Sequence, residues 1–118
     1  MEYHTYGGMI IAELICPAHC IRDTQDILDL MATVSYCRDA AGIMIKGPHL
    51  PEDFFDLHTG LAGELLEKCS NYRFNLAIKG DFSNVKSRSL RDFIRESNRT
   101  GKVLFVSEIH EAVQKWAR

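Results

Sequence analysis

A polar turn after an apolar run is the first part of this chain that could bind a ligand. The apolar run Phe74–Lys79 ends at Lys79, and the polar turn after it holds Asp81, Ser83 and Asn84. Loops at the carboxyl ends of buried strands hold ligands in many α/β proteins, and a following helix offers N–H groups to an anion. We therefore expect these four residues to be candidate ligands for a small anion or a nucleotide. Their types fit a structural turn equally, because the Gly-rich spacing of a phosphate loop is absent.

A second candidate region precedes an amphipathic segment in the middle of the chain. Phe54, Phe55, Asp56 and His58 would form an interaction surface if the two rings are exposed, whereas buried rings would form a lid on the core. Thr59 follows at the expected start of a helix, where the helix dipole favours a phosphate group. Thr59 is therefore a candidate phosphoacceptor, with a helix cap as the alternative role.

No residue pattern completes a catalytic or metal motif. The five histidines are scattered, with no pair at the i, i+4 spacing of a helical metal site. The segment Cys16-Pro17-Ala18-His19-Cys20 lacks the second ligand pair of a structural zinc site. We predict no catalytic residue, no metal site and no cofactor. Without an export signal, Cys16, Cys20, Cys37 and Cys69 are expected to be reduced and buried or half-buried.

The composition is that of an ordinary soluble domain. The chain has 118 residues, of which 46% are hydrophobic and 25% charged, with a net charge of −2. No apolar run approaches a membrane span, and no signal peptide is recognisable, so we expect a cytoplasmic protein without membrane partners. Residues 1–59 hold 3 Lys/Arg against 9 Asp/Glu, whereas residues 60–118 hold 11 against 7. The basic half interleaves Arg88, Arg91, Arg95 and Arg99 with acidic residues, so no nucleic-acid partner is expected.

Short apolar runs alternate with amphipathic segments along the chain. The expected strands are Tyr3–Tyr6, Met9–Cys16, Ala41–Lys46, Phe74–Lys79 and Lys102–Val106. The expected helices start at Asp23 or Thr24, near Leu57, at Ser87 or Ser89, and after Ser107. In the second helix, Ala62-Gly63 is expected to allow close packing, most simply against the sheet, and Gly101 is expected to end the third.

This order predicts an α/β fold. A hairpin across Gly7-Gly8 is followed by a helix and then by three strand–helix units. We predict one domain over residues 1–118, with a mixed, mostly parallel sheet, an N-terminal antiparallel hairpin and about four helices.

Four segments carry a resemblance to a known family. They are Asp53–Leu57, Gly60–Glu64, Gly80–Ser83 and Ser89–Asn98. Together they are similar to domain-of-unknown-function family 4180, a bacterial family with no assigned activity. The resemblance covers nearly the whole chain and implies a bacterial source, but no chemistry.

The order of elements and the segment Phe105–Ala112 also resemble the STAS domain (sulfate transporter and anti-sigma factor antagonist). In the bacterial antagonists a Ser-Gly-Leu at the start of the second helix carries the phosphorylated serine, and Thr59-Gly60-Leu61 stands at a similar place here. The STAS pattern has an aspartate directly before the serine pair, whereas this chain has His58 there and Asp56 three residues before Thr59. The resemblance implies a STAS-like fold and phosphorylation at Thr59.

These observations favour a non-enzymatic, STAS-like regulatory or protein-interaction module. Its working surface would be the Phe54–Gly60 loop with the Gly80–Ser89 turn. The partner would be another protein or a second copy of the chain as a homodimer. The alternative is a protein, or an enzyme, that acts on a small anion or nucleotide at the carboxyl edge of the sheet. A concave pocket there would favour the alternative.

Overall fold

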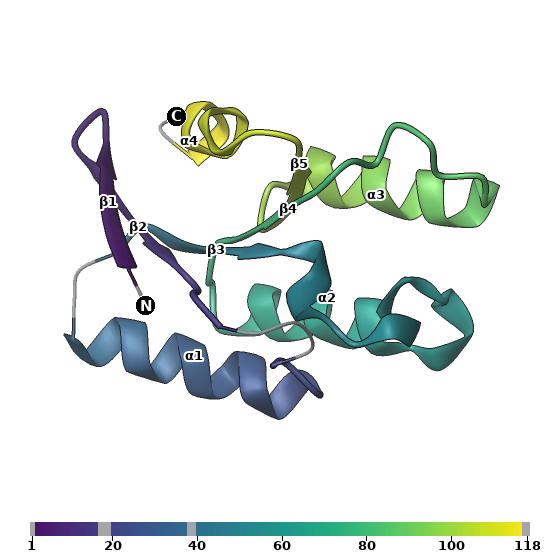
Figure 1. Ribbon diagram of the computed structural model, residues 1–118, viewed down its shortest axis with the longest axis horizontal. Coiled ribbons are helices and arrows are strands. Elements are labelled where there is room, and N and C mark those ends of the chain that lie inside the picture. Colours follow the sequence, from purple (N-terminus) through teal and green to yellow (C-terminus); the bar gives the residue numbers. More distant parts are fainter. Residues whose placement is uncertain (1, 17–19, 38–39, 117–118) are drawn as a thin grey trace.

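Strands and helices alternate along the chain in the computed structural model, which describes residues 2–16, 20–37 and 40–116 (Figure 1). The strands are β1 (Glu2–Tyr6), β2 (Met9–Glu13), β3 (Gly42–Lys46), β4 (Leu76–Lys79) and β5 (Val103–Val106). The helices are α1 (Thr24–Cys37), α2 (Leu61–Asn71), α3 (Arg88–Thr100) and α4 (Ile109–Trp116). Three short 3-10 turns, η1 (Gly47–His49), η2 (Glu52–Phe55) and η3 (Leu57–Thr59), join β3 to α2.

The five strands form one sheet in the order of the sequence, β1-β2-β3-β4-β5. β1 and β2 are antiparallel and are joined at Gly7 and Gly8, whose φ angles of 56° and 85° suit a two-residue hairpin. The remaining neighbours are parallel. The predicted α/β fold, with a mixed sheet, an N-terminal hairpin and four helices, is confirmed.

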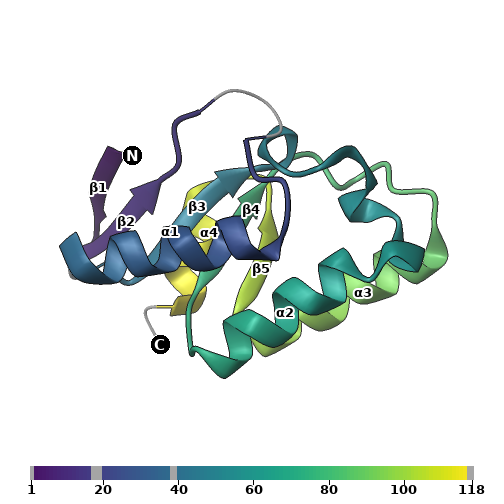
Figure 2. The same cartoon turned by 90° about the horizontal axis from the view of Figure 1, so that it is seen from below.

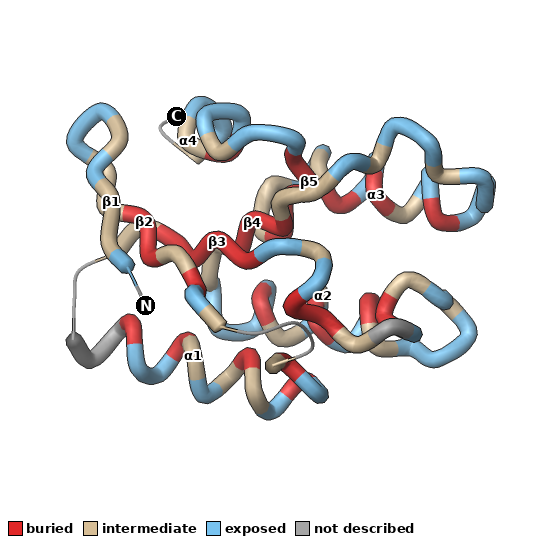
Figure 3. Tube along the Cα trace, in the orientation of Figure 1, coloured by how far each residue is buried: buried red, intermediate tan, exposed pale blue. Residues whose placement is uncertain are grey.

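The helices divide unequally between the two faces of the sheet. Each parallel connection advances by one strand in the same direction, and right-handed crossovers then place α1, α2 and α3 on one face. Figure 2 looks onto these three helices, with α4 on the far side of the sheet. We call the two sides the three-helix face and the α4 face. Each has its own buried cluster, and the larger lies on the three-helix face. Figure 3 shows that buried residues are concentrated along the central strands of the sheet.

Strand alternation assigns side chains to these faces. On the three-helix face the strands contribute Ala12, Ile43, Ile45, Leu76, Ile78, Val103 and Phe105, and Leu14 joins them directly after β2. On the α4 face it contributes Ile11, Met44, Ala77, Leu104 and Val106. Because the strands bury both faces, they read in the sequence as continuous apolar runs.

Trp116 fixes α4 to the sheet. Its Nε1 donates a hydrogen bond of 2.9 Å to the carbonyl oxygen of Gly101. Its ring lies over Gly42, where a Cβ would come within 2.8 Å of the ring and 2.9 Å of the carbonyl oxygen of Asn75. Only glycine therefore fits at the start of β3.

Two side chains of α3 close the outer edge of β5. The Asn98 amide donates to the carbonyl oxygen of Phe105 at 3.2 Å and accepts from its N–H at 2.7 Å. The fully buried Ser97 donates its hydroxyl to the carbonyl oxygen of Val103. The carbonyl oxygen of Val103 and both backbone groups of Phe105 are therefore bonded within the chain and are not offered to another strand.

The predicted helix ends are confirmed at three places. The side chain of Asp23 accepts from the N–H of Asp26 at 3.1 Å, and that of Ser87 accepts from the N–H of Leu90 at 3.2 Å. Gly101 ends α3 in the left-handed region, with φ 86°.

The predicted second helix started too early. Leu57 lies in η3, and α2 begins at Leu61, because the left-handed Gly60 (φ 77°) interrupts the helical path. Of the pair Ala62-Gly63, which was expected to pack closely, Ala62 is buried in the core, but the prediction was wrong for Gly63. This residue is exposed, and outside its own helix no atom of the described residues lies within 4 Å of the place of a Cβ.

The prediction of reduced cysteines was wrong for one pair. Cys16 and Cys20 form a disulfide between β2 and α1, because the loop brings their Cα atoms to 6.3 Å, a usual distance for this bond. Residues 17–19 within that loop, including His19, lie outside the described residues. Cys69 is a buried thiol, and burial raises its pKa to about 12. The side chain of Cys37 lies outside the described part.

Among the described residues, no helix has the length and apolar character needed to cross a membrane.

Candidate functional site

Two loops meet at the carboxyl edge of the sheet. The first, after β3, holds η2 and η3, and the second, after β4, runs from Gly80 to Ser87. Phe55 and Phe82, one from each loop, have ring centroids 6.0 Å apart. Both rings also contact Phe105 of β5, at 6.4 and 5.3 Å. The predicted proximity of the two loops is confirmed, and their contact is aromatic.

The phenylalanine rings are the base of these loops rather than their outer surface. Phe54 is 4% exposed and Phe55 is half-buried. Their rings meet edge to face at 5.0 Å, a favourable arrangement for aromatic pairs. The loop therefore keeps its shape through burial of these rings on the three-helix face.

Asp56, His58 and Thr59 form the exposed turn above this base. Oδ1 of Asp56 accepts from the N–H of His58 at 3.0 Å and lies 3.0 Å from its ring Nδ1. These contacts, first the backbone bond and then the ring, hold the pKa of Asp56 below its usual value. The Thr59 hydroxyl donates to the carbonyl oxygen of Asp56 at 2.9 Å and accepts from the N–H of Leu61 at 3.3 Å. Thr59 is thus exposed, next to a carboxylate, at the start of α2.

The second loop has its own internal bonds. Oδ1 of Asp81 accepts from the hydroxyl of Ser83 at 2.6 Å and from its N–H at 3.0 Å. These two bonds, the hydroxyl first, lower the pKa of Asp81. Asn84 is exposed beside them. The predicted ligand residues Asp81, Ser83 and Asn84 thus lie together, with Asp81 and Ser83 bonded to one another.

Lys79 does not join this group. Strand alternation places the Lys79 side chain on the α4 face, on the other side of the sheet from the ring of Phe82. Its Nζ lies 3.9 Å from Oε2 of Glu108, with the lysine side chain 37% exposed. The predicted ligand set is therefore divided between the two faces of the sheet.

His49 connects three segments near the same edge. Its Nδ1 accepts from the N–H of Lys46 at 3.0 Å, and its carbonyl oxygen accepts from the N–H of Ile21 at 3.0 Å. The ring also bonds the backbone of Cys16, and burial lowers the pKa of His49. The neutral imidazole thus ties the β2–α1 loop to the end of β3. This role of His49 could not be predicted from the sequence, since a single histidine after a strand has no distinctive spacing.

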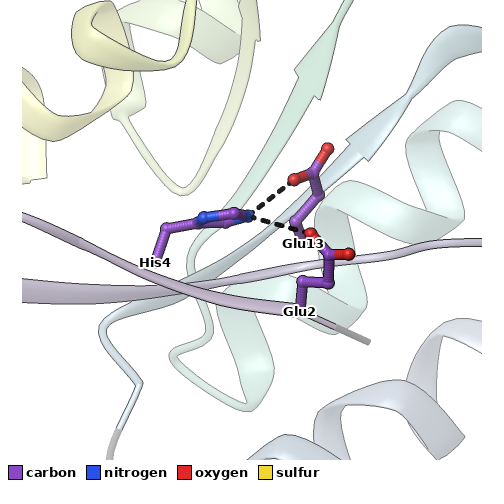
Figure 4. A group of neighbouring side chains, drawn as sticks. All are labelled: Glu2, His4 and Glu13. Atoms are coloured by element: carbon purple, nitrogen blue, oxygen red, sulfur yellow. Dashed lines mark hydrogen bonds and ion pairs between the residues drawn. The ribbon is translucent and has the colours of Figure 1, made fainter.

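A cluster of metal-ligating side chains on the β1–β2 hairpin was also missed. It consists of Glu2, His4 and Glu13, whose ligand atoms all lie within 4.8 Å of one another (Figure 4). Glu2 and Glu13 are cross-strand partners, and His4 is two residues from Glu2 on the same side of β1. The Gly7-Gly8 turn is the sequence signal that could have identified this cluster, because a two-residue turn fixes the register of the hairpin.

Comparison with known proteins identifies a family but no activity. A family model described as "Domain of unknown function (DUF4180)" matches residues 7–116. No curated protein and no solved structure matches the chain.

Proposed function

The chain belongs to the family of domains of unknown function DUF4180, and we propose that it is a non-enzymatic regulatory or protein-interaction module. Its working surface would be the exposed side of Phe54–Gly60 and Gly80–Ser89, which we call the carboxyl-edge surface. The observation that carries this proposal is the contact of Phe55 with Phe82, which joins the two loops on one aromatic base.

A fixed base favours binding of a partner. Loops that are already ordered lose little conformational entropy when they bind, so more of the contact energy appears as affinity. The buried Phe54 and the three-ring contact of Phe55, Phe82 and Phe105 supply that order. The polar side chains above the base then provide specificity.

The carboxyl-edge surface carries charges of both signs. Asp56 and Asp81 are exposed, and their lowered pKa values keep them ionised well below neutral pH. Lys86 and Arg88 are exposed further along the second loop, towards the start of α3. A partner that places basic side chains against the two aspartates would associate faster and in a defined orientation. The partner would be a protein with such side chains or, in a homodimer, a basic surface of a second copy.

Regulation by phosphorylation of Thr59 is part of this proposal and rests on the STAS resemblance. A phosphate on the Thr59 hydroxyl would remove the bond to the Asp56 carbonyl and place about two negative charges near the Asp56 carboxylate. The resulting repulsion would change the surface that a partner meets. A uniformly unmodified Thr59, measured by intact mass on protein from the native host under several growth conditions, would contradict this part.

The alternative, binding or conversion of a small anion or nucleotide at the same edge, has weaker support. Asp81 and Ser83 bond each other, and Lys79 lies on the opposite face beside Glu108. A small molecule retained through purification of the native protein would favour this alternative.

Quantitative capture from the native host tests the main proposal. The bait proteins are the wild type, the double variant Asp56→Lys/Asp81→Lys and a charge-matched control, Glu64→Lys/Glu67→Lys, on the exposed side of α2. We expect one partner to be depleted at least tenfold with the first variant and to be retained by the control. Equal capture by all three baits would contradict the proposal.

A further inference from the structure

We propose that Glu2, His4 and Glu13 form a binding site for a divalent transition-metal ion, with Zn²⁺ as the representative ion, on the β1–β2 hairpin. The site is separate from the carboxyl-edge surface and does not depend on it. It would fasten the edge strand β1 to the sheet.

The register of the hairpin creates an electrostatic conflict that a cation would resolve. Glu2 and Glu13 are directly opposite each other, and like charges in that position destabilise an antiparallel pair. The side chain of Glu13 is only 16% exposed, so water screens its charge poorly. A doubly charged ion between the two carboxylates would turn this repulsion into attraction.

His4 makes the group a donor set for a transition metal rather than a pair of opposed acids. Its Nε2 lies 2.7 Å from Oε1 of Glu13 and 3.7 Å from Oε2 of Glu2 (Figure 4). Imidazole nitrogen and carboxylate oxygen are both ligand types that Zn²⁺ binds, and three protein ligands leave a position for water.

The distances between the three ligand side chains need only a small change to fit a tetrahedral ion. Ligands about 2.1 Å from a tetrahedral ion are about 3.4 Å from one another. The distance from His4 to Glu2 already has that size, and the distance from His4 to Glu13 must open by somewhat less than 1 Å. Glu2 is 62% exposed and can follow by rotation of its side chain, whereas the backbone positions are fixed by the hairpin.

Lys46 is the group that would compete with the ion. Its Nζ lies 4.0 Å from Oε2 of Glu13, on the α4 face, and its side chain is 50% exposed. An ammonium group at this distance opposes a second cation, so removal of this charge is expected to strengthen metal binding.

Titration of the full chain with Zn²⁺, followed by calorimetry, tests the site. We expect one ion per chain, with affinity reduced at least tenfold in each of His4→Ala, Glu13→Gln and Glu2→Gln, and increased in Lys46→Met. The matched control is His58→Ala, which removes a histidine that also lies 3.0 Å from a carboxylate but has no third ligand among the residues that the structure describes. It should bind as the wild type does.

A second readout covers the case in which a variant disturbs the hairpin. Glu2→Gln changes only one atom of an exposed side chain, so its circular dichroism should match the wild type while its affinity falls. Co²⁺ as a probe should give visible absorption bands without a thiolate charge-transfer band. Absence of Zn²⁺ binding at millimolar concentration, unchanged affinity in all three ligand variants, or a thiolate band from Co²⁺ would each overturn the proposal.

Discussion

The two faces of the sheet are covered in different ways. The three-helix face is covered by α1, α2 and α3, and its core extends into the aromatic base of the carboxyl-edge loops. The α4 face has one short helix, which contacts β4 and β5. Towards β1 and β2, ionisable side chains such as Glu13 and His4 occupy this face instead. Hydrophobic packing thus supports the proposed carboxyl-edge surface, whereas ionisable side chains form the proposed metal site on the β1–β2 hairpin.

The largest expected effect comes from truncation of neighbouring residues on β3 that point to opposite faces. Ile45 is fully buried on the three-helix face, and Met44 is 4% exposed on the α4 face. We expect Ile45→Ala to lower the free energy of unfolding by about 4 kcal/mol and Met44→Ala by about 2 kcal/mol, because the larger core cannot relax into the cavity. Urea unfolding of both variants measures the difference. A greater loss of stability in Met44→Ala than in Ile45→Ala would contradict this expectation.

The second-largest loss of stability is expected where α4 contacts the sheet closely. Gly42→Ala should destabilise the protein by about 2 kcal/mol, because the new methyl group would overlap the Trp116 ring and the Asn75 carbonyl oxygen. The same denaturant titration, with Trp116 fluorescence as the probe, checks this. Gly42→Ala with wild-type stability would show that α4 is less firmly seated than its contacts imply.

On the three-helix side, replacement of Gly63 is expected to increase the stability of the protein. This glycine lies within α2, is exposed and has open space at the place of a Cβ. Gly63→Ala should therefore raise the free energy of unfolding by up to about 1 kcal/mol through helix propensity. Thermal unfolding followed by circular dichroism is sufficient to detect it. A lower melting temperature would mean that the exposed side of α2 is occupied.

The smallest effect concerns His49 and depends on pH. Burial lowers its pKa below the unfolded value of 6.5, so the unfolded chain binds a proton first as the pH falls. The stability that the neutral ring provides is complete above pH 6.5 and decreases below it. Unfolding at pH 7.5 and pH 5.5 should show a smaller pH difference in His49→Asn than in the wild type. His110→Asn, at an exposed position, is the control.

Much of the fold could be predicted from the sequence because its signals are local. The Gly7-Gly8 turn, the cap at Ser87 and the stop at Gly101 each depend on a few adjacent residues. The start of α2 was misplaced because Leu57 has helical spacing, and the interruption at Gly60 comes from its left-handed backbone.

The candidate sites were harder to predict because they depend on which face a side chain takes. Lys79 is adjacent in sequence to the Asp81–Ser83 turn but lies on the other side of the sheet. His4 and Glu13 are nine residues apart and meet only through the hairpin register. The Cys16–Cys20 bond was missed because the missing export signal predicts free thiols, whereas the bond depends on the loop that brings the two residues together.

Site-specific photo-crosslinking in the native host tests the central claim, that the carboxyl-edge surface is where this protein meets its partner. A photoreactive amino acid would replace Asn84 on that surface or Gln114 on the exposed side of α4. We expect a discrete crosslinked product from position 84, reduced by Asp56→Lys, and none from position 114. A product from position 114 alone, or no product from position 84, would contradict it.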